Sequence, residues 1–138
     1  VERPALARLK RRQEFLAAAR GRKAGTGALG LQGRRRREDE GVAGGVVRLG
    51  FTCSKKVGNA VERNRARRRL KAAASELAVS LGAPGCDYVL IGRRATIDYP
   101  FDRLLTDMRR AFQTVNAKLR EASNDDRAST AGDPARSW

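Results

Sequence analysis

Residues 55–71 read KKVGNAVERNRARRRLK, and this stretch holds eight Lys and Arg side chains against a single Glu. Asn59 and Glu62 have the spacing of an N-cap residue and its partner in a capping box, which predicts that a helix begins at Ala60. Apolar residues then recur at helical spacing, at Ala66, Leu70, Ala73, Leu77 and Leu81. Because the segment GAPG at 82–85 stops this pattern, we expect a helix over residues 60–81.

The polar side of this helix is almost entirely cationic. Its members are Asn64, Arg65, Arg68 and Lys71, with Arg67 and Arg69 on the flanks. A solvated surface would mix charges of both signs, whereas here neighbouring arginines repel one another by roughly 0.2–0.5 kcal/mol per pair. Arg63 and Arg65 also lie near the positive end of the helix dipole, which is unfavourable unless an anion is present. The pattern therefore favours phosphate binding, for which paired guanidinium donors are well suited.

Composition narrows the possible functions. The 138 residues include 30 Lys and Arg against 15 Asp and Glu, and a net charge of +15 favours a polyanionic partner. There is no His, which excludes catalytic triads with a His base and argues against a structural zinc site. Cys53 and Cys86 lie in strand-like segments, and we expect both to be reduced core residues. The sequence shows neither an apolar run of about 18 residues that could span a bilayer nor the pattern of a signal peptide.

Hydrophobic periodicity and turn residues predict the other elements. In chain order we expect a helix at 6–19, a Gly-rich connection at 21–27, a strand at 28–32, a polar loop at 33–45, a strand at 46–53, the central helix, a strand at 87–92 and a helix at 101–120. The two strands that flank the polar loop are expected to pair as a hairpin.

This order, helix-strand-strand-helix-strand-helix, predicts an α+β fold. We expect an α/β sandwich in which the helices pack on a small mixed sheet. Residues 1–120 would form a single domain. Residues 121–138 are dominated by Ser, Asn, Asp and Gly, so we predict a disordered tail.

The motif KKVGNAV followed directly by ERNRARRRL resembles the signature of the bacterial ribonuclease P protein component. The R-N-R core of that signature corresponds to Arg63, Asn64 and Arg65, and the preceding segment RLGFTCS at 48–54 is also similar to the family. The resemblance extends over roughly residues 8–120. It implies the same fold, with a left-handed β-α-β crossover through the central helix.

The resemblance implies a protein subunit of a ribonucleoprotein that removes the 5′ leader from precursor tRNA by phosphodiester hydrolysis. The RNA subunit would carry the catalysis and hold most of the Mg²⁺, so that the protein alone binds no cofactor and has no catalytic residue. One protein would bind one catalytic RNA in the cytoplasm, with no membrane partner. The implied contacts to the RNA subunit are Lys55, Lys56, Arg63, Asn64, Arg65, Arg67 and Arg68; for Asn64, a structural hydrogen bond is the alternative.

Phe15, Thr52 and Lys56 are the implied contacts to the single-stranded leader. On its own, a Phe in an amphipathic helix is more simply a core residue, whereas the resemblance makes Phe15 a groove wall that stacks on bases. The chain has Ala19 and Gln32 where the family commonly has further aromatic side chains. Stacking should therefore be weaker, and backbone electrostatics should matter more.

Two further basic groups have competing interpretations. The arginines at 34–37 precede three acidic residues, which indicates a self-neutralising loop or, alternatively, an auxiliary RNA contact. Arg93 and Arg94 follow a strand and could contact phosphate.

Three other function classes compete with the ribonuclease P assignment. A general RNA-binding or ribosome-associated module would show no preference for a leader. A self-contained nuclease would need a carboxylate cluster, but the acidic residues are scattered. A membrane-surface protein would need a larger apolar face on the basic helix.

Overall fold

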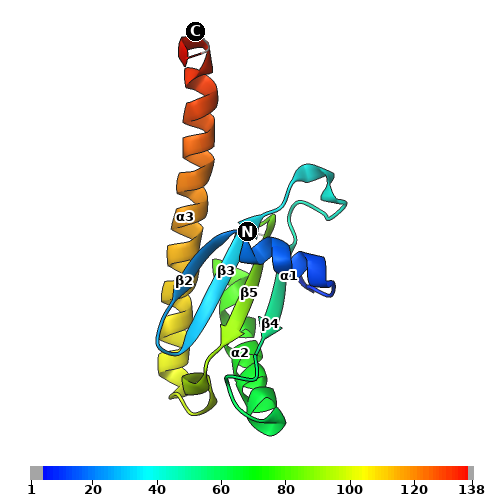
Figure 1. Cartoon of the computed structure of the whole chain (residues 1–138), viewed down its shortest axis with the longest axis vertical. Coiled ribbons are helices and arrows are strands. Elements are labelled where there is room, and N and C mark those ends of the chain that lie inside the picture. Colours follow the sequence, from blue (N-terminus) through cyan, green and yellow to red (C-terminus); the bar gives the residue numbers. More distant parts are fainter. Residues whose placement is uncertain (1–4, 137–138) are drawn as a thin grey trace.

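The computed structural model describes the backbone of residues 5–136 and the side chains of residues 5–122. Its elements are β1 (Leu6–Arg8), α1 (Arg12–Ala19), β2 (Arg22–Gly25), β3 (Leu29–Arg35), a 3₁₀ turn η1 (Glu38–Glu40), β4 (Val47–Thr52), α2 (Ala60–Leu81), β5 (Cys86–Gly92), a second 3₁₀ turn η2 (Arg94–Ile97) and α3 (Phe101–Arg136) (Figure 1).

The strands form one mixed sheet in the order β1-β4-β5-β3-β2. β1 and β5 run parallel to β4, whereas β3 runs antiparallel to both β5 and β2. The parallel neighbours β4 and β5 are joined through α2, as the predicted crossover requires, and the handedness of that crossover stays a prediction. The α+β class and the packing of helices on a small mixed sheet are confirmed.

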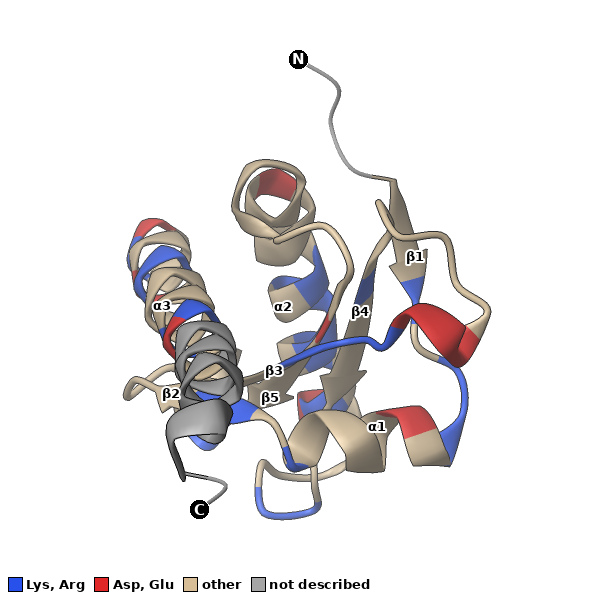
Figure 2. Ribbon diagram, turned by 90° about the horizontal axis from the view of Figure 1, so that it is seen from above, with Lys and Arg blue, Asp and Glu red and all other residues tan. Residues whose placement is uncertain are grey.

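Helices cover the two faces of the sheet unequally. α2 and α3 lie on one face and the short α1 lies on the other (Figure 2). The larger core lies under α2 and α3, where the rings of Tyr88 and Phe112 are 4.9 Å apart and both side chains are fully buried. The Tyr88 hydroxyl donates to Asn116 Oδ1 at 2.5 Å and accepts the Ala83 N–H at 2.8 Å, which ties β5 to α3 and to the end of α2.

The predicted helix at 6–19 is wrong in its first half. Residues Leu6–Arg8 form β1, which pairs with β4, and α1 begins only at Arg12. The Leu9 N–H donates to the Leu49 carbonyl at 2.9 Å, so the chain stays attached to the sheet beyond β1. Pairing with a distant strand therefore overrides the weak helical pattern of three leucines.

The predicted connection at 21–27 and the predicted hairpin are also wrong. Residues Arg22–Gly25 form β2, which makes a hairpin with β3, and β3 continues to Arg35. β5 lies between β3 and β4, so these two strands do not pair. The reason is burial: apart from Asp87, the side chains of β5 are apolar or aromatic, and the strand is nearly fully buried on both faces, which is typical of a central strand.

The central helix agrees with its prediction at both ends, Ala60 and Leu81. α3 continues to Arg136, beyond the expected end near residue 120. Side chains after Ala122 and residues 137–138 lie outside the described part, so the expected disordered tail stays a prediction. Cys53 and Cys86 are free and buried, as predicted, and burial raises the pKa of both thiols.

Candidate nucleic-acid interface

The start of α2 is fixed by reciprocal hydrogen bonds. The Glu62 N–H donates to Asn59 Oδ1 and the Asn59 N–H donates to Glu62 Oε1, both at 2.9 Å, which confirms the predicted capping box. Gly58 has a φ of 153°, and a Cβ there would lie 2.4 Å from Glu62 Oε1, so the box itself requires glycine. Lys55 and Lys56 are exposed on the turn that leads into this helix end.

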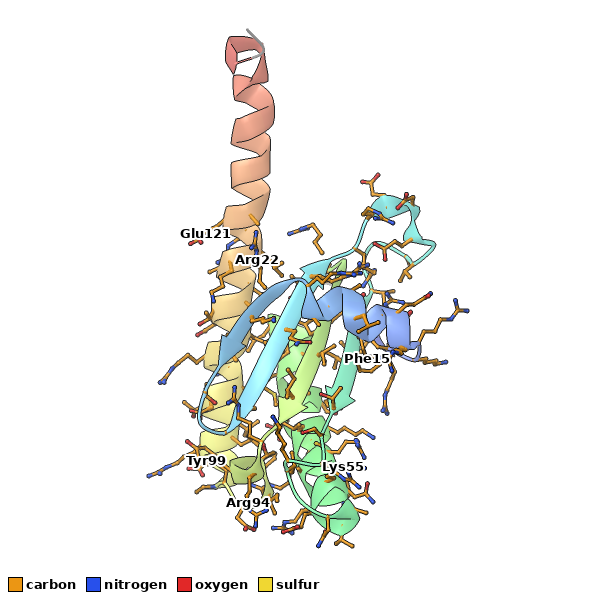
Figure 3. All side chains as sticks on the ribbon, in the orientation of Figure 1. Phe15, Arg22, Lys55, Arg94, Tyr99 and Glu121 are labelled. Carbon is orange, nitrogen blue, oxygen red and sulfur yellow. The ribbon has the colours of Figure 1, made fainter. Side chains whose placement is uncertain are left out.

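Arg94 contacts both the turn before α2 and the first turn of the helix. Its Nη1 donates to the Val57 carbonyl at 3.2 Å, and its Nη2 lies 3.9 Å from Glu62 Oε2. Figure 3 shows Lys55 and Arg94 at the same end of the molecule, where α2 begins. The predicted lysines therefore project from a turn that is held at both ends.

The exposed side of α2 brings together three of the seven predicted RNA contacts, Asn64, Arg67 and Arg68. A shallow pocket of about 420 Å³ is lined by Val61, Asn64, Arg67, Arg68 and Lys71. Arg67 Nη1 donates to Asn64 Oδ1 at 3.1 Å, so Asn64 makes the structural hydrogen bond that was its alternative role, and it orients an arginine by doing so. Within the described residues, no carboxylate lies within ion-pair distance of Lys55, Lys56, Arg63, Arg67, Arg68 or Lys71.

Two arginines of the motif point to a different place. Arg65 Nε donates to the Ile97 carbonyl at 2.9 Å, and its Nη2 lies 3.8 Å from Asp98. Arg69 Nε donates to the Thr96 carbonyl at 2.9 Å, and its guanidinium also binds the Tyr99 carbonyl. These contacts attach α2 to the corner between η2 and α3. Arg65, whose side chain is 50% exposed, thus combines a structural contact with remaining access to solvent.

Sequence reasoning missed one extension of the basic surface. The guanidinium of Arg8 lies 5.7 Å from the centre of the Phe51 ring, and the ammonium of Lys71 lies 6.0 Å from the same centre. Cation–π attraction thus holds two cations at the edge formed by β1 and β4. The sequence pattern predicts a helix at Arg8, and no local signal indicates that Arg8 lies beside Phe51.

The other face of the sheet brings Phe15 and Thr52 together. Phe15 is half-buried and lies on Gly50, where a Cβ would come within 2.5 Å of the ring (Figure 3). It packs with the small cluster of Leu9, Ala18 and Val89. Thr52 follows Gly50 by two residues and therefore faces the same side. Lys56 lies four residues beyond Thr52, on the exposed turn that leads into α2.

The same face continues past α1 toward the β2–β3 hairpin. A shallow depression of about 350 Å³ is lined there by Gly25, Gly30, Gln32, Ile91 and Arg93, among others. The Arg93 guanidinium lies over the two glycines, where added Cβ atoms would be 2.8 and 3.4 Å from Nη2. Gln32 contributes a polar side chain to this depression.

The arginines at the end of β3 and in the following loop make two kinds of contact, ion pairs near the surface and one buried ion pair. Arg34 pairs with Glu40 and Arg37 pairs with Asp39, which confirms the self-neutralising interpretation for these two residues. Arg36, by contrast, is buried and its guanidinium pairs with Asp87 at 2.7 Å. No local pattern in the sequence indicates this second role, because Asp87 is 51 residues away.

These surfaces define a class of protein. Among the described residues, no group of three or more His, Cys, Asp or Glu side chains could hold a metal, and no described helix is long and apolar enough to cross a membrane. The described surface combines the cationic helix α2 with a sheet face that the short helix α1 covers only in part. That combination is typical of an RNA-binding α+β protein.

Comparison with known proteins identifies the family. Residues 4–116 match the family model described as ribonuclease P. The ribonuclease P protein component of Ruegeria pomeroyi is 54% identical over 79% of this chain and 86% of its own length. That of Caulobacter vibrioides is 42% identical over 81% and 72%, respectively. A solved structure of a Staphylococcus aureus RNase P protein mutant has a TM-score of 0.63 at 22% identity, and the match covers 79% of this chain and 87% of that one.

The chain therefore belongs to the family of bacterial ribonuclease P protein components. Ribonuclease P is an endoribonuclease that matures the 5′ end of tRNA, and this chain is its protein subunit. Its partners are the ribonuclease P RNA and the tRNA substrate.

Proposed function

We propose that this subunit acts by binding and positioning rather than by chemistry of its own. The cationic side of α2 and its leading turn bind the catalytic RNA through Lys55, Lys56, Arg63, Asn64, Arg65, Arg67 and Arg68. The observation that supports this most directly is the absence of ion-pair partners for most of these cations within the described residues, because phosphates would supply the missing charge.

The second part of the proposal concerns the substrate. The 5′ leader of precursor tRNA lies along the open sheet face and contacts Phe15, Thr52 and Lys56. The half-buried ring on Gly50 leaves part of its surface for a base, and single-stranded RNA is commonly bound by such stacking beside a cationic groove.

Metal and stoichiometry complete the proposal. Mg²⁺ is held mainly by the RNA subunit, since the carboxylates of the described residues do not form a cluster suited to a hard cation. One protein binds one RNA in the cytoplasm. Residues 1–120 form the single RNA-binding domain.

Reconstitution tests whether the RNA subunit catalyses the cleavage and the protein assists it by binding. We expect the protein alone to leave precursor tRNA intact, and the protein added to a bacterial ribonuclease P RNA to increase leader removal at low Mg²⁺, because it neutralises phosphates that would otherwise need metal ions. Cleavage is followed on gels with and without each component. Leader removal by protein free of RNA would contradict the proposal. Equal stimulation of unrelated RNA processing would favour a general RNA-binding module.

Replacing Phe15 tests the leader contact. If its ring stacks on a base, Phe15→Ala weakens the binding of precursor tRNA to the reconstituted enzyme by roughly 1–3 kcal/mol and leaves mature tRNA unaffected. Both affinities and the melting temperature are measured on one variant. Thr114→Ala, on the exposed side of α3, is the control and should change none of the three. A core role alone would instead lower both affinities equally, together with a large drop in melting temperature.

A further inference from the structure

A network of ion pairs lies on the same face of the sheet as Phe15. It starts at Asp87 on β5, whose side chain is fully buried. Arg48 on β4 binds this carboxylate with two parallel hydrogen bonds of 2.8 Å, from Nε to Oδ1 and from Nη2 to Oδ2. Arg36 adds a third bond of 2.7 Å to Oδ1. Such a bidentate pair fixes the orientation of the Arg48 guanidinium as well as its position.

The network of ion pairs extends from Arg48 to α1. Arg48 Nη1 donates to Glu14 Oε2 at 2.6 Å. The other oxygen of Glu14 accepts the backbone N–H groups of Lys10 and Arg11, each at 2.8 Å. Burial by itself would raise the pKa of Glu14, but the two N–H groups and Arg48 hold the pKa below its ordinary value, so the side chain is ionised at neutral pH. One carboxylate therefore joins the first turn of α1 to the sheet.

Little else holds this helix. α1 has eight residues, too few to be stable alone, and Ala18 is its only buried residue. Leu16 is exposed, and the N-cap residue Arg11 makes no side-chain hydrogen bond as a cap. Phe15 immediately follows Glu14, and its ring lies so close to Gly50 that a Cβ there would come within 2.5 Å. The placement of the ring therefore depends on the placement of the first turn.

We propose that Glu14, held through Arg48 by Asp87, is a positioning residue that sets where Phe15 lies over the sheet and thereby shapes the leader contact. This inference rests on the proposed leader role of Phe15. Glu14 itself points to Arg48 and to the backbone of α1 rather than to the groove, so it acts through Phe15 and not on RNA.

A double-mutant cycle in the reconstituted enzyme tests the proposal. Glu14→Gln keeps an oxygen that can accept the two backbone N–H groups but loses the charge that binds Arg48. The measured quantity is the ratio of the affinities for precursor tRNA and mature tRNA. We expect Glu14→Gln to lower this ratio by about 2- to 10-fold, within the range for coupled neighbours. In a Phe15→Ala background, Glu14→Gln should lower it no further.

A matched control and a second measurement separate positioning from general stability. Asp39→Asn removes another Arg–carboxylate pair, one whose side chains are both over 70% exposed, and should leave the ratio unchanged. Hydrogen exchange of Glu14→Gln should show faster exchange in α1 than in the wild type, with β3, β4 and β5 unchanged. This measurement does not depend on RNA.

The possible failures are distinguishable. If Phe15→Ala lowers the ratio but Glu14→Gln does not, or lowers it equally in both backgrounds, the positioning role is rejected and the leader contact stands. Unchanged exchange in α1 also rejects it. If Phe15→Ala itself leaves the ratio unchanged, the leader contact fails and the inference fails with it.

Discussion

Asp87→Ala is expected to destabilise the fold by about 3–5 kcal/mol, because it removes the anion from a buried cluster of cations. Asp87 is fully buried, and the Arg36 side chain that binds it is only 3% exposed. Arg34 Nε also lies within ion-pair distance of the same carboxylate, at 3.5 Å, although this buried atom makes no hydrogen bond. Without Asp87, the guanidiniums of Arg36 and Arg48, and that of Arg34 nearby, would lie close together with little solvent to screen their charges. Urea or thermal unfolding of the free protein measures the loss.

Asp39→Ala is the control for this substitution. It removes an exposed pair with Arg37, where both side chains are more than 70% exposed, so its cost should be about 0–1 kcal/mol. Equal losses for the two variants would show that burial does not make Asp87 special.

The pH dependence of stability gives a second check on Asp87. Burial alone would raise its pKa, but the hydrogen bonds and charges of Arg48 and Arg36 hold it below the ordinary value of 3.8. Because folding lowers this pKa, the ionised carboxylate stabilises the fold fully at pH values above its unfolded pKa, and this contribution is lost as the pH falls through the lowered folded pKa. The wild type should therefore lose stability steeply in this acidic range, whereas Asp87→Ala should lose less.

The sequence predicted α2 correctly because both of its signals are local. The capping box lies within four residues and the apolar stripe repeats over consecutive turns, so neither depends on the rest of the chain. β1 and β2 were missed for the opposite reason. Each has three or four residues with no buried side chain, and each exists because it pairs with a longer strand. Only the assembled sheet supplies that pairing.

The candidate site likewise has features that the sequence predicts and features that only the fold reveals. The basic stretch is visible in the sequence because charge and helical spacing are local properties. The separate roles of its arginines are not, since the carbonyls that bind Arg65 and Arg69 lie 32 and 27 residues further along the chain. Likewise, the resemblance suggests a role for Phe15 from the sequence. The ion pair between Glu14 and Arg48, by contrast, joins residues that are 34 positions apart, so it is evident only in the fold.

The largest effect on function is expected from salt. If the cationic side of α2 and its leading turn neutralise about six to ten phosphates, affinity for the ribonuclease P RNA should fall on the order of 10³–10⁵-fold between about 50 and 200 mM salt. The cause is the return of counterions to the RNA, which becomes more favourable for each contact as salt rises. Filter binding or fluorescence anisotropy over a salt series measures the slope of log affinity against log salt concentration.

Two variants connect this slope to the geometry of α2. Arg68 is exposed and has no ion-pair partner within the described residues, so Arg68→Ala should reduce the slope by about one and leave the melting temperature unchanged. Arg65→Ala should reduce the slope by no more than about one and also lower the melting temperature, because the bond from Arg65 to the Ile97 carbonyl is lost. A nearly flat salt dependence of the wild type would contradict phosphate binding by this helix. Identical behaviour of the two variants would contradict the separate structural role of Arg65.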